Sequence, residues 1–116
     1  MLNFTGSLKI FLAVDHVDLR KSFSGLWSVT QNILKENPTN GALYVFTNRR
    51  HTRIKILYWD GTGLWVLIKR LEKGTFSWPK GIETEGGKLE LAPEALAILL
   101  DGIDLRHGSL RPWYQR

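Results

Sequence analysis

The sequence predicts an α+β fold, a mainly antiparallel β-meander with one long helix in its N-terminal half and one short C-terminal helix. Three runs between residues 42 and 71 are rich in β-branched and aromatic residues and are separated by turn residues. Two other segments repeat apolar residues at helical spacing. With 116 residues, 43% of them hydrophobic, the chain has material for one core. We therefore expect a single domain over residues 1–105 and an irregular tail over 106–116.

The long helix is expected to begin after Asp18, a residue type that caps helix N-termini. Apolar residues recur at helical spacing from Leu19 to Leu34, and Pro38 lies just beyond the end of this pattern. The short helix is expected to run from Pro93 to Leu100, because proline favours the first helical position and a glycine at 102 can close the helix. The strands are expected at Leu8–Ala13, Ala42–Thr47, Arg53–Asp60, Leu64–Leu71 and Lys88–Leu91.

The hairpin formed by the third and fourth strands can be registered in two ways. If residues 61–63 form a three-residue loop, Asp60 lies opposite Leu64 and the two faces of the hairpin separate by character. One face is then wholly apolar. The other carries cations and tryptophans, a platform suited to nucleic acid: Arg53, Lys55, Lys69, Trp59 and Trp65. Core packing of the two tryptophans is the alternative, since tryptophan is usually buried.

Positive charge is concentrated in the same part of the chain. The segment from Arg49 to Lys73 contains seven basic and two acidic residues, which accounts for the whole net charge of +5. A concentrated basic patch is typical of a surface that meets phosphates, although it can also serve only solubility. The residues that we expect to contact phosphates are Arg49, Arg50, Arg53, Lys55, Lys69 and Arg70, and we expect Trp59 to stack on a base.

Two further cations, Arg20 and Lys21, fall in the first turn of the expected long helix, where the helix dipole disfavours positive charge. Exposed amides at a helix start attract phosphate, and neighbouring cations would strengthen such a site. The alternative is a surface ion pair with Asp15 or Asp18, which contributes little. We include both cations among the candidate nucleic-acid-binding residues.

The sequence contains few signals of catalysis. The three histidines have no metal-ligand spacing, the chain has no cysteine, and Asp60 beside Gly61 reads as a turn residue. We expect no enzyme activity, no metal and no cofactor. No apolar run approaches the ~20 residues that span a bilayer, and the N-terminus lacks a signal-peptide pattern. We therefore expect a cytoplasmic protein without a membrane partner.

Several motifs resemble one known family. They are Asp18-Leu19-Arg20-Lys21, the run from Arg53 to Gly61, and the run from Lys69 to Pro79 that contains Phe76 and Trp78-Pro79. In this order they are similar to the small TnpB-type accessory protein, the second open reading frame, of bacterial insertion-sequence family sixty-six. The resemblance spans nearly the whole chain. It implies a transposon-encoded protein that acts in DNA transposition beside a separately encoded transposase, which carries the catalytic carboxylates.

The residues and the resemblance together predict a non-catalytic accessory protein that binds the DNA of transposon ends through a basic β-hairpin. The alternative is an adaptor that joins the transposase complex without touching DNA. Trp113 and Tyr114 in the tail would then be its anchors, because aromatic residues are enriched at binding hot spots. Other transposon proteins are expected partners, and the sequence leaves open whether the chain forms a homo-oligomer.

Overall fold

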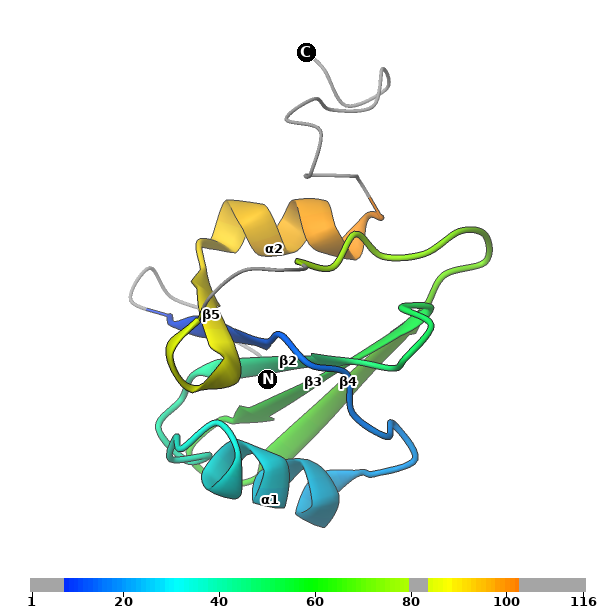
Figure 1. The fold of residues 1–116 in the computed structure, drawn as a ribbon. Coiled ribbons are helices and arrows are strands. Elements are labelled where there is room, and N and C mark those ends of the chain that lie inside the picture. Colours follow the sequence, from blue (N-terminus) through cyan, green and yellow to red (C-terminus); the bar gives the residue numbers. More distant parts are fainter. Residues whose placement is uncertain (1–7, 80–83, 103–116) are drawn as a thin grey trace.

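The computed structural model describes residues 8–79 and 84–102. Within them the chain forms a five-stranded sheet with a helix on each face (Figure 1). The elements in chain order are β1 (Ile10–Ala13), α1 (Phe23–Asn32), β2 (Leu43–Thr47), β3 (Arg53–Trp59), β4 (Leu64–Arg70), the short 3₁₀ turn η1 (Glu85–Gly87), β5 (Lys88–Leu91) and α2 (Pro93–Leu100). The tail over 106–116, with Trp113 and Tyr114, lies outside the described residues.

The strands follow the order β4-β3-β2-β1-β5 across the sheet. β2, β3 and β4 form the expected antiparallel meander, and β5 pairs antiparallel with β1. β1 and β2 are parallel, with Ile10 opposite Leu43, because α1 carries the chain back across the sheet between them. The α+β class and the mainly antiparallel sheet are confirmed, and the parallel pair adds a β-α-β crossover to the meander.

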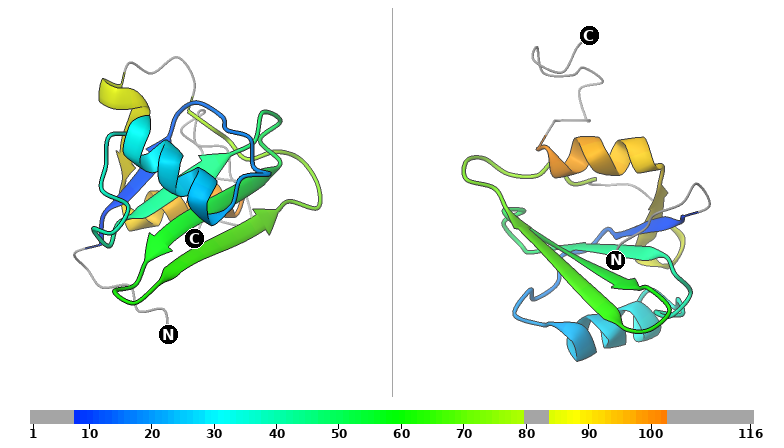
Figure 2. Two further views of the ribbon diagram at one scale, coloured as in Figure 1. Left: turned by 90° about the horizontal axis from the view of Figure 1, so that it is seen from below. Right: turned by 180° about the vertical axis from the view of Figure 1, so that it is seen from behind.

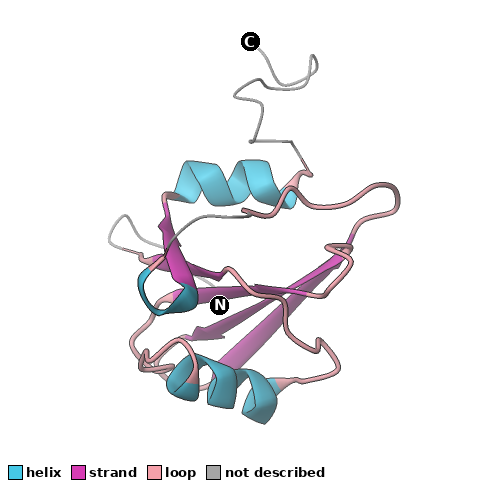
Figure 3. Ribbon diagram, in the orientation of Figure 1, coloured by secondary structure: helices cyan, strands magenta, loops and turns pink. Residues whose placement is uncertain are grey.

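Both faces of the sheet are packed, which explains why strand β2 is buried along its whole length. α2 and the segment from Phe76 to Trp78 cover one face, which we call the α2 face, and α1 covers part of the other, the α1 face (Figure 3). The α2-face core includes Ile10, Leu12, Leu43, Val45, Ile54, Ile56, Leu96 and Leu99. The α1-face core includes Leu26, Val29, Leu34, Tyr44, Phe46 and Leu57.

The prediction of one long helix was wrong. α1 spans ten residues and α2 eight, so both helices are short. Asp18 does not cap α1: its carboxylate accepts the backbone N–H of Arg20 at 3.0 Å, and its carbonyl accepts the N–H of Lys21 at 3.1 Å. These bonds close a separate turn, and Ser22 takes the N-cap position. An aspartate that bonds to its own backbone two residues on offers the chain an alternative to helix.

The predicted register of the hairpin was also wrong. Trp59, rather than Asp60, lies opposite Leu64, so the loop has one residue more than expected. The Asp60 carboxylate fixes this loop by accepting the N–H groups of Thr62 at 2.9 Å and Gly63 at 3.0 Å. Because side chains alternate along a strand, the shift by one residue moves every β4 side chain to the opposite face. Trp65, Leu67 and Lys69 therefore share the α2 face with Ile54 and Ile56.

Candidate functional site

Several basic residues gather where β2 ends and β3 begins. Arg53 lies directly opposite Arg70, and Lys55 follows Arg53 on the same face of β3, opposite Ile68. All of them are on the α1 face. Arg53 and Arg70 are exposed, Lys55 is half-buried, and Ile68 beside them is 63% exposed. We call this region, together with Lys21, Arg49 and Arg50, the basic end of the sheet.

Two arginines that face each other across a hairpin repel, so this pairing costs free energy unless an anion lies between them. Among residues 8–79 and 84–102 the ion pairs are Arg20 with Asp18 and Lys88 with Glu36, so neither Arg53 nor Arg70 has a carboxylate partner there. Neither β3 nor β4 contains an acidic residue. The local arrangement therefore leaves the positive charge of the basic end available to an anion.

The loop before α1 adds Lys21 to the basic end. Lys55 Nζ donates a hydrogen bond of 2.8 Å to the carbonyl oxygen of Lys21, which ties this loop to β3. The Lys21 side chain also packs closely against α1 at Gly25, where a Cβ would lie 2.7 Å from the Cβ of Lys21.

The turn between β2 and β3 presents Arg49 and Arg50. The side-chain oxygen of Asn48 accepts the backbone N–H groups of Thr52 at 2.9 Å and Arg53 at 3.1 Å, while its amide donates to the Thr52 hydroxyl. These bonds hold the turn, so the arginines between them are exposed to solvent. The sequence predicted both the arginines and the turn at residues 48–52, but not the side-chain bonds by which Asn48 positions the arginines.

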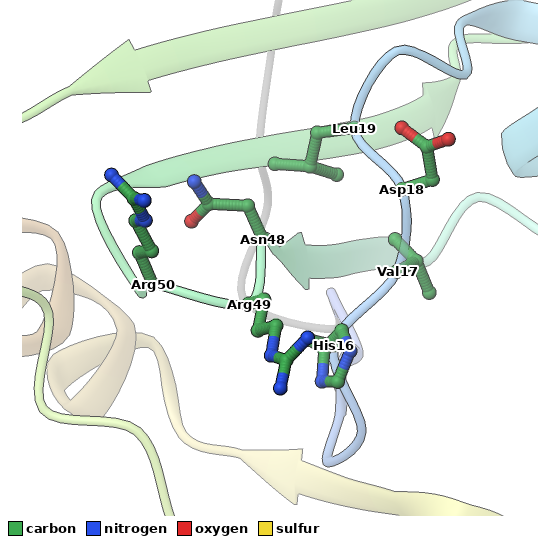
Figure 4. Close-up of a pocket in the computed structure, with 7 residues that line it drawn as sticks. All are labelled: His16, Val17, Asp18, Leu19, Asn48, Arg49 and Arg50. Carbon is green, nitrogen blue, oxygen red and sulfur yellow. The ribbon is translucent and has the colours of Figure 1, made fainter.

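A surface pocket of about 480 Å³ lies between this turn and the 16–19 segment. Val17 N–H donates to Thr47 O at 2.9 Å, which holds the segment against the end of β2. Figure 4 shows the Arg49 side chain extending beside His16 at one side of the pocket and Arg50 at the other. The pocket is thus lined by four nitrogen-bearing side chains, His16, Asn48, Arg49 and Arg50. His16 was not among the candidate site residues predicted from the sequence.

Arg20 and Asp18 form an exposed ion pair with Nη2 to Oδ2 at 2.7 Å. Hydrogen bonds from the Arg20 side chain hold the pKa of Asp18 well below its ordinary value, and the carboxylate raises the pKa of Arg20. The Asp18 carboxylate points away from Arg49 and Arg50 (Figure 4). The negative charge of Asp18 is therefore paired with Arg20. Of the two roles that the sequence suggested for Arg20, the structure shows the surface ion pair with Asp18.

Three residues of the predicted platform do not lie together with Arg53 and Lys55 as expected. Lys69 is on the α2 face, where Nζ donates to the carbonyl oxygen of Leu100 at 2.7 Å at the end of α2. Trp59 shares the α1 face with Arg53 but lies at the other end of β3 and is half-buried. Trp65 is on the α2 face, and its indole N–H donates to Asp60 at 2.8 Å. The predicted platform of cations and tryptophans on one face is therefore wrong.

Replacing Asn48 with alanine should destabilise the protein by about 1–2 kcal/mol, because two backbone N–H groups lose their acceptor. Urea unfolding followed by circular dichroism measures this loss. Asn32→Ala is the control, because Asn32 is an exposed helical asparagine with one side-chain bond, to Ser28. Equal midpoints for the two variants would show that Asn48 does not hold the turn.

The part of the chain that the structure describes contains no cluster of three or more histidine, aspartate or glutamate residues able to hold a metal ion. Among the same residues no helix is long and apolar enough to cross a membrane.

Comparisons with known proteins show to which family the chain belongs. The model of the family described as IS66 Orf2 like protein matches residues 8–109. Two relatives come from Sinorhizobium fredii (strain NBRC 101917 / NGR234). The uncharacterized protein y4hO is 38% identical over 107 residues, 92% of this chain and 90% of the relative.

The second relative, the uncharacterized protein y4jC, is 31% identical over 112 residues, 97% of this chain and 93% of the relative. No solved structure matches the chain. The family matched is an accessory family of transposition and not a known catalytic one. The chain therefore belongs to the IS66 Orf2-like family, whose members are associated with transposition.

Proposed function

We propose that this protein is a non-catalytic accessory factor of DNA transposition that binds transposon-end DNA through the basic end of its sheet. The observation that carries the proposal is the pair Arg53 and Arg70, which face each other on an exposed surface without a carboxylate partner among the described residues. A phosphate between them would relieve their repulsion. Local rules broken without an evident structural gain often mark function.

The other cations of the basic end suit the same ligand. Arg49 and Arg50 project from a turn that Asn48 holds, and the pocket beside them opens next to His16. Arginines of this kind bind phosphate oxygens through two parallel hydrogen bonds. Lys21 and Lys55 lie beside one another at the start of α1. Contacts to phosphates fix where a protein sits on DNA without reading its sequence, so the basic end supports binding and not base recognition.

Salt dependence tests the proposal. If the basic end neutralises about five phosphates, the logarithm of the affinity should fall against the logarithm of the salt concentration with a slope of roughly −4 to −5. Fluorescence anisotropy with labelled transposon-end duplex, unrelated duplex and single strand, each at several salt concentrations, measures it. Similar slopes on the two duplexes are expected. Binding that is absent, or that does not respond to salt, would refute the proposal.

The adaptor alternative depends on Trp113 and Tyr114, which lie outside the described residues. Removing residues 107–116 separates the two functions, because a DNA-binding protein should keep its affinity for duplex and an adaptor should lose co-purification with the transposase. DNA binding is supported by the described part of the chain, because the cations that would bind DNA lie together at the basic end of the sheet. Loss of duplex binding on truncation would contradict the placement of the interface at the basic end.

A further inference from the structure

Strand β4 forms one edge of the sheet (Figure 2, right). The bonds of Leu71 N–H to Thr52 O and of Asp60 N–H to Gly63 O, both 3.1 Å, flank the β3–β4 ladder and set its phase. Residues 65, 67 and 69 therefore bond to β3, and the main-chain groups of residues 64, 66, 68 and 70 point outward. Within residues 8–79 and 84–102 no strand pairs with this outer side.

The edge has few of the features that usually prevent pairing between chains. β4 is seven residues long, its sequence LWVLIKR has neither proline nor glycine, and its pairing with β3 is continuous, without a bulge. Ile68 and Trp65 are exposed to 63% and 38%. Long, exposed, apolar edge strands are templates for a further strand, and proteins usually blunt them with charge, proline or a bulge. Only the last two residues of β4 carry charge.

The charges along this edge complement a second copy of the same edge. Asp60 begins the loop between β3 and β4 and accepts the indole N–H of Trp65, and Lys69 and Arg70 end the strand. In an antiparallel pair centred on Leu67, Lys69 of one copy lies opposite Trp65 of the other, next to Asp60, and Arg70 lies opposite Leu64. A cation beside an indole and a carboxylate is favourable. In a parallel pair with the same centre, Lys69 and Arg70 of one copy would instead lie beside Lys69 and Arg70 of the other, and like charges would repel.

We propose that the protein forms a two-fold symmetric dimer in which β4 pairs antiparallel with β4 of a second copy, centred on Leu67. This register aligns all seven residues of both strands. It pairs outward-facing residues with one another, Val66 with Ile68 and Leu64 with Arg70, so their main-chain groups bond across the interface. The dimer joins the two sheets into one continuous sheet, the usual outcome of strand addition at an edge.

The symmetry has a consequence for the basic ends. A two-fold axis that relates antiparallel neighbouring strands runs perpendicular to the sheet, so both α1 faces lie on the same side. The two copies of Arg70 are each three residues from the axis, which separates them by roughly 20 Å at about 3.4 Å per residue. The dimer itself does not depend on DNA binding, and it is tested without DNA.

Analytical ultracentrifugation of the full chain, over protein concentrations from about 1 to about 200 µM, should detect the dimer, because these concentrations cover micromolar affinities. Ile68→Lys should weaken dimerisation about tenfold or more, because a lysine on the edge disfavours strand addition. Ile33→Lys is the matched control: Ile33 is 62% exposed and precedes Leu34, which contacts β5 at the opposite edge. A wild-type monomer throughout this range, or equal dimerisation of both variants, would overturn the proposal.

Cysteine substitution tests the register directly, because the chain contains no cysteine. Leu67 lies opposite itself in a pair without hydrogen bonds, where Cα atoms are about 4.5 Å apart, within the range that a disulfide spans. Leu67→Cys should therefore form a covalent dimer on mild oxidation, whereas Val66→Cys and Ile68→Cys should not. Circular dichroism confirms that each variant is folded. Crosslinking at 66 or 68 in place of 67 would refute this interface.

Discussion

Replacing Arg53, Lys55 and Arg70 together with alanine should weaken binding to duplex DNA roughly 100-fold or more at about 0.1 M salt. Each phosphate contact contributes about 0.9 to the salt slope, so three lost contacts should also flatten the slope by about 2 to 3. The fold should tolerate the change, since the variant removes two arginines that repel across the hairpin and one bond, from Lys55 to Lys21. Anisotropy titrations at several salt concentrations measure both quantities.

The matched control changes the same net charge elsewhere. Lys9, Lys69 and Lys73 are exposed, and Lys69 lies next to Arg70 on the same strand but on the opposite face. Their triple alanine variant should lose affinity much less, and it should leave the salt slope nearly unchanged. If both variants weaken binding equally, the protein responds to its net charge and the basic end is not an interface. The single variants Arg70→Ala and Lys69→Ala repeat this comparison for two adjacent residues.

The strands and the short C-terminal helix could be predicted because their patterns are local. Alternation of β-branched and aromatic residues marked β2, β3 and β4 to within one residue at each end. Pro93 and the glycine at 102 marked α2, whose last turn ends with a bond from Gly102 N–H to Leu99 O. These signals do not depend on what the rest of the chain does.

The errors came from two aspartates whose side chains bond to nearby backbone. Asp18 closes a turn that delays the start of α1, and Asp60 adds a residue to the hairpin loop. Aspartate is common both at helix N-caps and in turns. The sequence therefore could not show that Asp18 closes a separate turn instead of capping α1, or that Asp60 lengthens the hairpin loop. The wrong register was favoured because it separates an apolar face of the hairpin from a charged one. That criterion does not apply here, since both faces of this sheet are packed.

The candidate site was predicted in composition but not in arrangement. Charge counting identified Arg49, Arg50, Arg53 and Arg70 without any knowledge of the fold. It could not separate Lys69 from Arg70, because their division between two faces depends on the register. The contact between Lys21 and Lys55 joins residues 34 positions apart, which no local pattern predicts.

Trp78→Ala should destabilise the protein by about 3–5 kcal/mol, the range for removing a buried tryptophan. Trp78 is 2% exposed within the α2-face core, and its indole N–H donates to the carbonyl oxygen of Ala13 at 2.9 Å. Since small domains have total stabilities of about 5–15 kcal/mol, this is a large fraction of the whole. Trp78→Phe keeps most of the ring but leaves the buried Ala13 carbonyl without its donor, so it should cost about 1–3 kcal/mol.

The effect of Trp78 should extend to the basic end, because its segment supports the turn that carries Arg49 and Arg50. Phe76 N–H donates to His51 O at 2.7 Å, and the His51 ring stacks on Trp78 with centroids 6.0 Å apart. Urea unfolding followed by circular dichroism gives the stability loss. The control is Trp65→Ala, an exposed tryptophan bonded to Asp60, which should cost much less. Equal losses of stability in Trp78→Ala and Trp65→Ala would mean that the α2-face core does not depend on Trp78. Unchanged DNA affinity in a folded Trp78→Phe variant would show that the basic end does not depend on Trp78.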